Sequence, residues 1–209
     1  MPNYLPLFPL KLVPFPGEQV NLHIFEPRYR QMLHDINEGN GLMGIAVYID
    51  KLMPLGTEVK LQEITKIYED GRMDIKTVGT RIFEIFTFDN PIEGKLYAGG
   101  KVVYRQNDPK VEKVLYDEFI FFMKEFFRLI GHEETLLKPG LVNSYTLSHK
   151  IGLKMEEEYD LIQLEKESDR ISYLIKHLKR ILPVMRDLEQ VKSKIKMNGH
   201  FKNLDPLDF

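Results

Sequence analysis

LPLFPLKLVPFPGEQVNLHIFEPRYRQML, residues 5–33, is the stretch that decides the fold. Its apolar residues are punctuated by prolines and lead into a helix start near Pro27, because a first-turn position does not need the N–H that proline lacks. We expect this helix to end at Gly39. Four apolar residues share its inner face by their three- and four-residue spacing: Tyr29, Met32, Leu33 and Ile36.

The chain up to about Gln106 has the punctuation of an all-β domain, with short runs of Val, Ile, Phe and Tyr between Gly, Pro and Asp-Gly signals. The clearest hairpin joins residues 57–69 to residues 72–79 through Asp70-Gly71, a pair that tolerates the positive φ of a type I′ turn. Further strands are expected at 42–49, 81–88 and 95–105, the last with a bulge or tight bend at Gly99-Gly100. A small twisted barrel flanked by one helix is the simplest container for these strands.

After Asn107 the apolar period becomes helical. Asp108 as N-cap, Pro109 as first helical residue and Gly131 as terminator predict one long helix. Later helices are predicted at residues 143–151, 156–166 and 168–196, with a kink or a break at Pro183. The expected organisation is therefore α+β, with a β-barrel subdomain at 1–107, a helical bundle subdomain at 108–197 and a flexible tail at 198–209.

Length and composition limit the class of protein. A chain of 209 residues is long enough to bury about 70% of its unfolded surface, so it needs no disulfide or metal to stay folded. It has no cysteine, which excludes thiol chemistry and agrees with a reducing compartment. The start of the chain is a poor signal peptide, and no apolar run approaches the roughly 20 residues of a membrane span. We expect a cytoplasmic protein without membrane partners.

Four segments in order resemble the N-terminal, substrate-binding domain family of Lon protease. They are residues 5–33, GTEV at 56–59, EDGRMDIKTVGTRIFEI at 69–85, and SYTLSHKIGL…YDLIQLEKESDRISYLIKHL at 144–178. The resemblance implies a PUA-like β-barrel followed by a C-terminal helical bundle, used in the family to recognise unfolded or damaged proteins. The resemblance is to a stand-alone form of this domain. A chain of 209 residues leaves no room for ATPase and protease modules, and no G-x-x-x-x-G-K-[ST] phosphate loop occurs in it.

Glu26, Arg28 and Arg81 match charged positions of the family's motifs. These residues could form a binding or catalytic cluster. The reading that we favour is a structural network that ties the helix to the barrel, because the planar fork of arginine suits a carboxylate.

No catalytic or metal site is indicated. No two of the six histidines have the i, i+4 spacing of an H-E-x-x-H site. Ser144 and His149 could be imagined as nucleophile and base, but no G-x-S-x-G elbow occurs and no orienting acid stands out. We expect a protein that is not an enzyme and uses no cofactor or metal.

The helix predicted after Pro109 has an apolar stripe that spreads over about half of its circumference. Such a stripe is wider than one docking face needs, so the helix could be sandwiched between barrel and bundle. The sharper hypothesis is that part of an aromatic margin stays exposed and binds other proteins. Four residues carry that hypothesis: Tyr116, Ile120, Phe121 and Phe127.

The sequence therefore predicts a non-catalytic protein-binding module for hydrophobic or unfolded segments, which could deliver them to a separate protease. The same surface could also support a homodimer. The alternative is an RNA-binding PUA-like barrel protein, for which the basic end of the chain at Lys192, Lys194 and Lys196 would supply contacts. The net charge of −2 gives no general attraction to phosphate, so nucleic acid is the less favoured partner.

Overall fold

The structure is a computed structural model that describes residues 3–131 and 142–199. The fold is α+β, a PUA-like barrel with C-terminal helices, as predicted. Its elements are β1 (Asn3–Leu10), β2 (Gln19–Ile24), α1 (Pro27–Glu38), β3 (Leu42–Tyr48), β4 (Leu52–Ile67), β5 (Met73–Ile85), β6 (Ala98–Tyr104), α2 (Lys113–Ile130), a 3₁₀ turn (Ser148–Lys150), α3 (Met155–Gln163) and α4 (Glu167–Gly199). The described residues divide into two compact units, residues 3–110 with 143–170, and residues 111–131 and 142 with 171–199. The end of the predicted flexible tail, residues 200–209, lies outside the described part of the chain.

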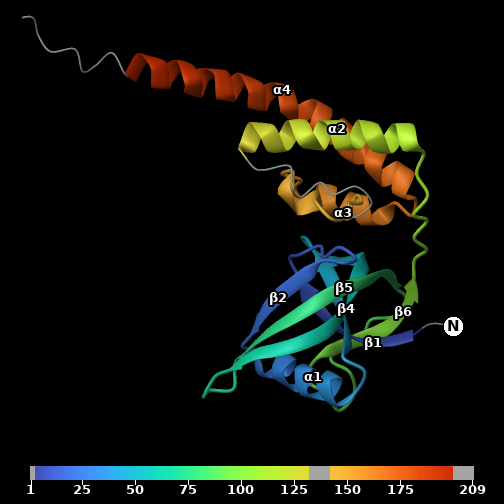
Figure 1. Ribbon diagram of the computed structural model, residues 1–209. Coiled ribbons are helices and arrows are strands. Elements are labelled where there is room, and N and C mark those ends of the chain that lie inside the picture. The colour runs from blue at the N-terminus through green and yellow to red at the C-terminus, as the bar shows by residue number, and fades with distance from the viewer. Residues whose placement is uncertain (1–2, 132–141, 200–209) are drawn as a thin grey trace, which may run out of the picture. The chain divides into compact units, whose positions relative to one another are not determined.

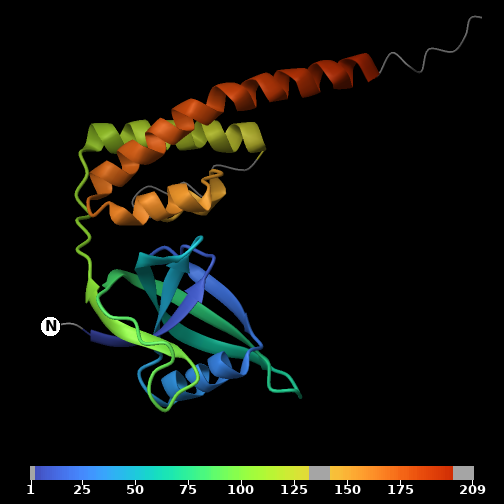
Figure 2. The ribbon, with the colours of Figure 1, turned by 180° about the vertical axis from the view of Figure 1, so that it is seen from behind.

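The six strands form one mixed sheet in the order β2-β5-β4-β3-β1-β6, and a further pairing of β5 with β6 closes it into a ring. Strand β1 runs parallel to β3, while the other pairs are antiparallel. Figures 1 and 2 show this barrel from opposite sides, with α1 across one end. Strand β2 stays outside the ring, because within the described residues it pairs with β5 alone.

A single long strand, β5, replaces the two strands predicted at 72–79 and 81–88. Its first half pairs with β2 and its last residues pair with β6. The register against β4 shifts three times, including between Glu58 and Val59, and such shifts increase the local twist of a strand pair. One strand can therefore bend far enough to serve both ends of the sheet.

The β4–β5 hairpin is present, but its turn is not type I′. A type I′ turn needs positive φ at both central residues, and in this turn only Gly71 has it, at 82°. Gly71 N donates to Tyr68 O, and Tyr68 N donates to Arg72 O. Gly71 is therefore the last residue of a three-residue loop, in which a β-turn over residues 68–71 needs positive φ at one position only.

Gly99 and Gly100 are required by close packing between strands rather than by a bulge or bend. A Cβ atom on Gly100 would lie 1.9 Å from the carbonyl oxygen of Thr87, and one on Gly99 would lie 3.0 Å from that of Leu5. The Leu5 backbone is held by the pairing of β1 with β6, and the Thr87 backbone is held by the hydrogen bond from Thr87 N to Lys101 O. Any side chain larger than hydrogen at Gly100 would open this seam.

Helix α1 confirms the prediction from the opening stretch. It spans Pro27–Glu38 with Gly39 as C-cap, and its buried residues are the four that were predicted from spacing. They join a core cluster inside the barrel with Met43, Ile45 and Val59. Burying one such side chain contributes roughly 1.5–3 kcal/mol, so this face holds the helix on the barrel.

Helix α2 begins at Lys113, four residues later than predicted. Asp108 is occupied elsewhere, because its N–H donates to Glu165 O and its carbonyl accepts from the N–H of Glu167. This pairing keeps residue 108 extended and prevents it from capping a helix. Gly131 ends α2 in the left-handed conformation, as predicted.

Residues 143–151 form turns and a 3₁₀ helix instead of the predicted α-helix. The side chain of Asn143 accepts hydrogen bonds from Tyr145 N and Thr146 N, and Ser144 N donates to Glu167. These side-chain bonds compete with the backbone bonds that a helix would use. The segment 143–170 groups with the barrel.

Helix α4 runs unbroken through Pro183 to Gly199. In the second unit it lies alongside α2, where Lys179 bonds Glu118 at 2.7 Å and Arg186 bonds Glu125 at 2.5 Å (Figure 1). Both pairs advance by seven residues, so the two helices run parallel.

Arg170 fastens the segment 143–170 together. Its side chain is 1% exposed and pairs with the buried Glu167 at 2.8 Å. The same guanidinium donates to Ser144 Oγ, to the carbonyl of Leu164 and to Asn107 Oδ1. One buried cation thus joins the end of β6, the 144 turn and the end of α3.

His149 ties the same segment to the barrel. Its Nδ1 lies 2.6 Å from Glu158 in α3 and its Nε2 lies 3.0 Å from Glu18 before β2. Burial alone lowers the pKa of this imidazole, but hydrogen bonds and charge from Glu158 and Glu18 outweigh it and raise the pKa to about 9. The ring is therefore protonated at neutral pH.

Arg170→Ala is expected to lower the free energy of unfolding by roughly 3–5 kcal/mol, because it leaves Glu167 buried without its cation. Arg72→Ala, which removes an exposed pair with Asp70, is the matched control and should cost less than about 1 kcal/mol. Urea denaturation of both variants measures the difference. Equal losses would contradict the role given to Arg170.

His149 should make stability fall with rising pH. Its pKa is higher in the folded state than the unfolded value of about 6.5, so its contribution is complete below pH 6.5 and is lost as pH rises through 9. We expect His149→Gln to remove roughly 1–3 kcal/mol at pH 6 and little at pH 10. Urea denaturation at both pH values tests this, and a pH-independent loss would refute the charged pairing.

Candidate functional site

An apolar pocket of about 230 Å³ opens between β1, β2 and the start of α1. The residues that line it are Phe8, Pro9, Leu10, Leu22, His23, Ile24, Phe25, Glu26, Arg28 and Tyr29. Phe8 and Tyr29 are in contact there, with ring centroids 3.9 Å apart. The wall is therefore aromatic and aliphatic, and its polar groups come from the helix start and His23.

The pocket exists because two strand edges diverge at this point. Leu7 is the last residue of β1 that pairs with β6, so residues 8–10 pair with β3 alone. Strand β2 pairs with β5 alone. Residues 8–10 of one edge and 22–24 of the other line the same cavity, which identifies it as the gap in the strand network.

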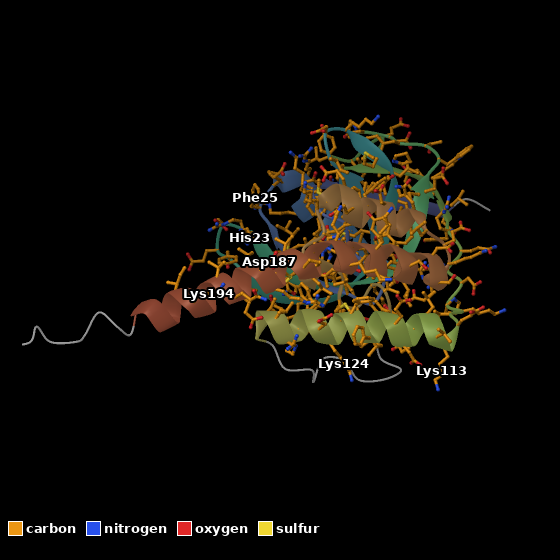
Figure 3. All side chains as sticks on the ribbon, turned by 90° about the horizontal axis from the view of Figure 1, so that it is seen from above. His23, Phe25, Lys113, Lys124, Asp187 and Lys194 are labelled. Carbon is orange, nitrogen blue, oxygen red and sulfur yellow. The ribbon has the colours of Figure 1, made fainter. Side chains whose placement is uncertain are left out.

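Phe25 stands at the rim of this pocket with 60% of its surface exposed. Its ring lies 6.1 Å from that of His23, and Figure 3 shows the two side chains next to each other on the outside of the barrel. A phenylalanine exposed beside an apolar cavity is a surface that another apolar group can cover.

The charges around the pocket are paired with one another. Glu26 accepts a hydrogen bond of 2.9 Å from Arg28, whose guanidinium also lies over the Tyr29 ring. His23 lies 2.6 Å from Asp74, and hydrogen bonds from His23 and Tyr68 lower the pKa of that carboxyl group. The rim therefore offers no unpaired charge from these groups to a charged ligand.

Arg81 lies apart from Glu26 and Arg28, and the predicted three-residue network divides into two pairs. Arg81 binds Glu58 of β4 with three hydrogen bonds of 3.1–3.2 Å, and Glu58 is 1% exposed. Tyr104 also donates to Glu58, and burial and this bond raise its pKa to about 12. The Arg81 pair joins two strands, and the Glu26–Arg28 pair is local to the start of α1.

A smaller pocket of about 120 Å³ lies between β5, the residues after β6 and the end of α3. Its charged lining residues are in ion pairs, since Arg81 binds Glu58 and Arg105 lies beside Glu84 and Glu165, although the buried Arg105 Nε makes no hydrogen bond within the described part of the chain.

Ser144 and His149, considered above as nucleophile and base, do not contact each other. Ser144 is buried against Glu167 and Arg170, while His149 faces Glu18 and Glu158.

The four residues proposed on α2 differ in exposure. Phe121 is 61% exposed, Tyr116 and Ile120 are partly buried, and Phe127 is 1% exposed. Tyr116 also donates its hydroxyl to Val142 O. Phe121 is thus the member that presents surface, and Phe127 belongs to the core.

The β1–β2 pocket was not among the sites predicted from the sequence. Its signal was in the opening stretch, where the apolar Phe25 follows Ile24, breaks the alternation of β2 and lies two residues before the helix start at Pro27. The cavity itself depends on which strands pair, and local patterns do not contain that information. The part of the chain that the structure describes contains no helix long and apolar enough to cross a membrane.

Fold and pocket together define a small barrel with helices that presents an apolar cavity at an incomplete strand pairing. The substrate-binding domain of ATP-dependent protease La (LON) matches residues 4–180, so the chain belongs to this family. The Lon N-terminal domain protein of Xanthomonas campestris superposes with a TM-score of 0.65 at 21% identity, covering 83% of this chain and 98% of that one. The N-terminal domain of Lon protease from the Mycobacterium avium complex gives 0.65 at 15% identity, with 85% and 98% covered. A search of curated proteins gave no match.

Arg81→Ala is expected to destabilise the protein by roughly 1–3 kcal/mol, because it leaves the carboxylate of Glu58 buried with neutral partners only. This expected loss of stability is smaller than the loss for a fully buried ion pair, because the Arg81 side chain is 54% exposed. Arg28→Ala removes an exposed pair at the start of α1 and is the control. Thermal denaturation measures both, and an unchanged melting temperature for Arg81→Ala would count against a structural role.

Proposed function

We propose that the protein is a non-catalytic substrate-recognition module that binds apolar, extended or unfolded segments of other proteins in the β1–β2 pocket. The observation that carries the proposal is the 230 Å³ cavity with Phe25 exposed at its rim. Membership of the Lon substrate-binding family gives it the general class of ligand, a protein substrate.

The chemistry of the pocket supports a neutral, apolar ligand. Its wall comes from Phe8, Leu22, Ile24 and Tyr29, and the rim charges are paired with each other. An apolar side chain that leaves water for such a cavity gains roughly 1.5–3 kcal/mol. A single contact of this kind gives weak binding, which suits a module that must accept many sequences.

Two further roles extend this proposal. A module that holds an unfolded segment can hand it to a separate protease, since binding and cleavage then occur on different chains. A homodimer through exposed apolar residues would compete with client binding for the same surface.

Binding is tested with a fluorescently labelled, reduced and carboxymethylated polypeptide that cannot refold, followed by anisotropy at low and high salt. Phe25→Ser should weaken binding by about 5- to 30-fold, because it removes the exposed aromatic group at the rim. Phe86→Ser is the matched control, an exposed phenylalanine beyond the end of β5 and outside the pocket lining. Binding of the unaltered protein should survive high salt.

Phe121→Ser in the same assay examines the α2 surface. A loss with Phe121→Ser and none with Phe25→Ser would move the site to α2 and refute the pocket. Affinity that falls steeply with salt would favour the RNA-binding alternative, because phosphate contacts release counterions. No binding to the unaltered protein would reject the proposed function.

A further inference from the structure

Strand β2 has an edge that no strand covers within the described residues, and this edge borders the apolar pocket. We infer that the protein captures its clients by β-strand addition, with an extended, uncharged polypeptide segment pairing along β2. The inference rests on the proposed function and specifies how the same site holds a client.

The register shows which backbone groups are available. Gly79 N donates to Glu18 O at 2.8 Å, and residues that bond across an antiparallel ladder alternate with residues whose groups point away. Val20, Leu22 and Ile24 therefore bond toward β5, while Asn21 and His23 direct their N–H and C=O groups to the open edge. The same alternation places Asn21 and His23 on the exposed face.

The edge lacks the features that normally prevent strand addition. Exposed edges in soluble proteins are usually protected by lysine, proline, inward-pointing charge or a bulge. QVNLHI, the sequence of β2, contains no lysine, no proline and no carboxylate, and it pairs with β5 over all six residues without a register shift. Six residues at about 3.4 Å each give a regular edge about 20 Å long.

The pocket supplies the side-chain part of the recognition. In strand addition, main-chain hydrogen bonds provide affinity and pockets beside the edge accept alternate side chains. Leu22 and Ile24 lie on the buried face of β2 and form one wall of the cavity, opposite Phe8 and Leu10 of β1. An apolar side chain of the added strand would enter this cavity, and the next one would face solvent.

The charges select against charged segments. Beside the edge, the charges of Glu26 and Arg28 are paired with each other, and the Asp74 carboxylate is in hydrogen-bond contact with His23. A client carboxylate or ammonium group placed there would meet a partner that is already occupied. The occupant that fits is an extended stretch with an apolar residue at alternate positions and no charge between them.

The test compares a short labelled peptide of alternating valine and threonine with the same peptide N-methylated at every residue, alongside the unfolded polypeptide. N-methylation removes the backbone donors and retains the side chains, so binding should fall by about 10-fold or more. Asn21→Pro removes one edge donor and places a ring on the edge, which a strand tolerates where its N–H faces solvent. It should weaken the binding of both ligands by a similar factor, while Asn21→Ala, which keeps the backbone donor, should weaken binding much less than Asn21→Pro.

Amide hydrogen exchange gives a site-specific reading on the unaltered protein. The N–H groups of Asn21 and His23 should become protected when the peptide binds. Equal binding of the methylated and unmethylated peptides, with no new protection at these two amides, would overturn strand addition and leave apolar docking of the unfolded polypeptide in place. If the unfolded polypeptide does not bind either, both the inference and the proposed function are refuted.

Discussion

The buried pair of Arg170 and Glu167 is the interaction on which the segment after the barrel depends. Taking two charges out of water costs several kcal/mol per ion unless their hydrogen bonds are replaced. Here the guanidinium reaches Ser144 Oγ, Leu164 O and Asn107 Oδ1, and the carboxylate accepts from the backbone and hydroxyl of Ser144. Because these bonds reach three stretches of chain, at Asn107, Ser144 and Leu164, they hold the three together around one buried pair.

Local signals predicted the features that depend on neighbouring residues. Proline at a first turn, glycine after the last turn and apolar spacing gave α1 with its buried face, and the left-handed Gly131 gave the end of α2. The β4–β5 hairpin followed from Asp70-Gly71 between alternating strands. The ordered segments that resemble the Lon domain gave the family, and residues 4–180 match it.

The features that escaped prediction depend on partners far along the chain. Strand β1 forms although it contains Pro6 and Pro9, because pairing with β3 and β6 outweighs the missing donors, and β2 forms by pairing with β5. Asp108 is drawn away from a helix start by Glu165 and Glu167, and Arg81 selects Glu58 over Glu26. The pocket belongs to this group as well, since it is a gap between two edges and no residue in the sequence marks a gap.

Strand β2 is held in place along its whole length by β5, so its open edge already has the extended conformation that the proposed strand addition requires. Because the strand is already ordered, binding costs the module little conformational entropy, and the client segment bears nearly all of this cost. Fixing each client residue costs about 1–2 kcal/mol, while a typical hydrogen bond returns about 0.5–1.5 kcal/mol. The balance is close to zero for a flexible chain and unfavourable for one that must first unfold. In the proposed mode of binding, the edge would respond to how long a segment stays extended, and it would sort proteins by their state of folding more than by their sequence.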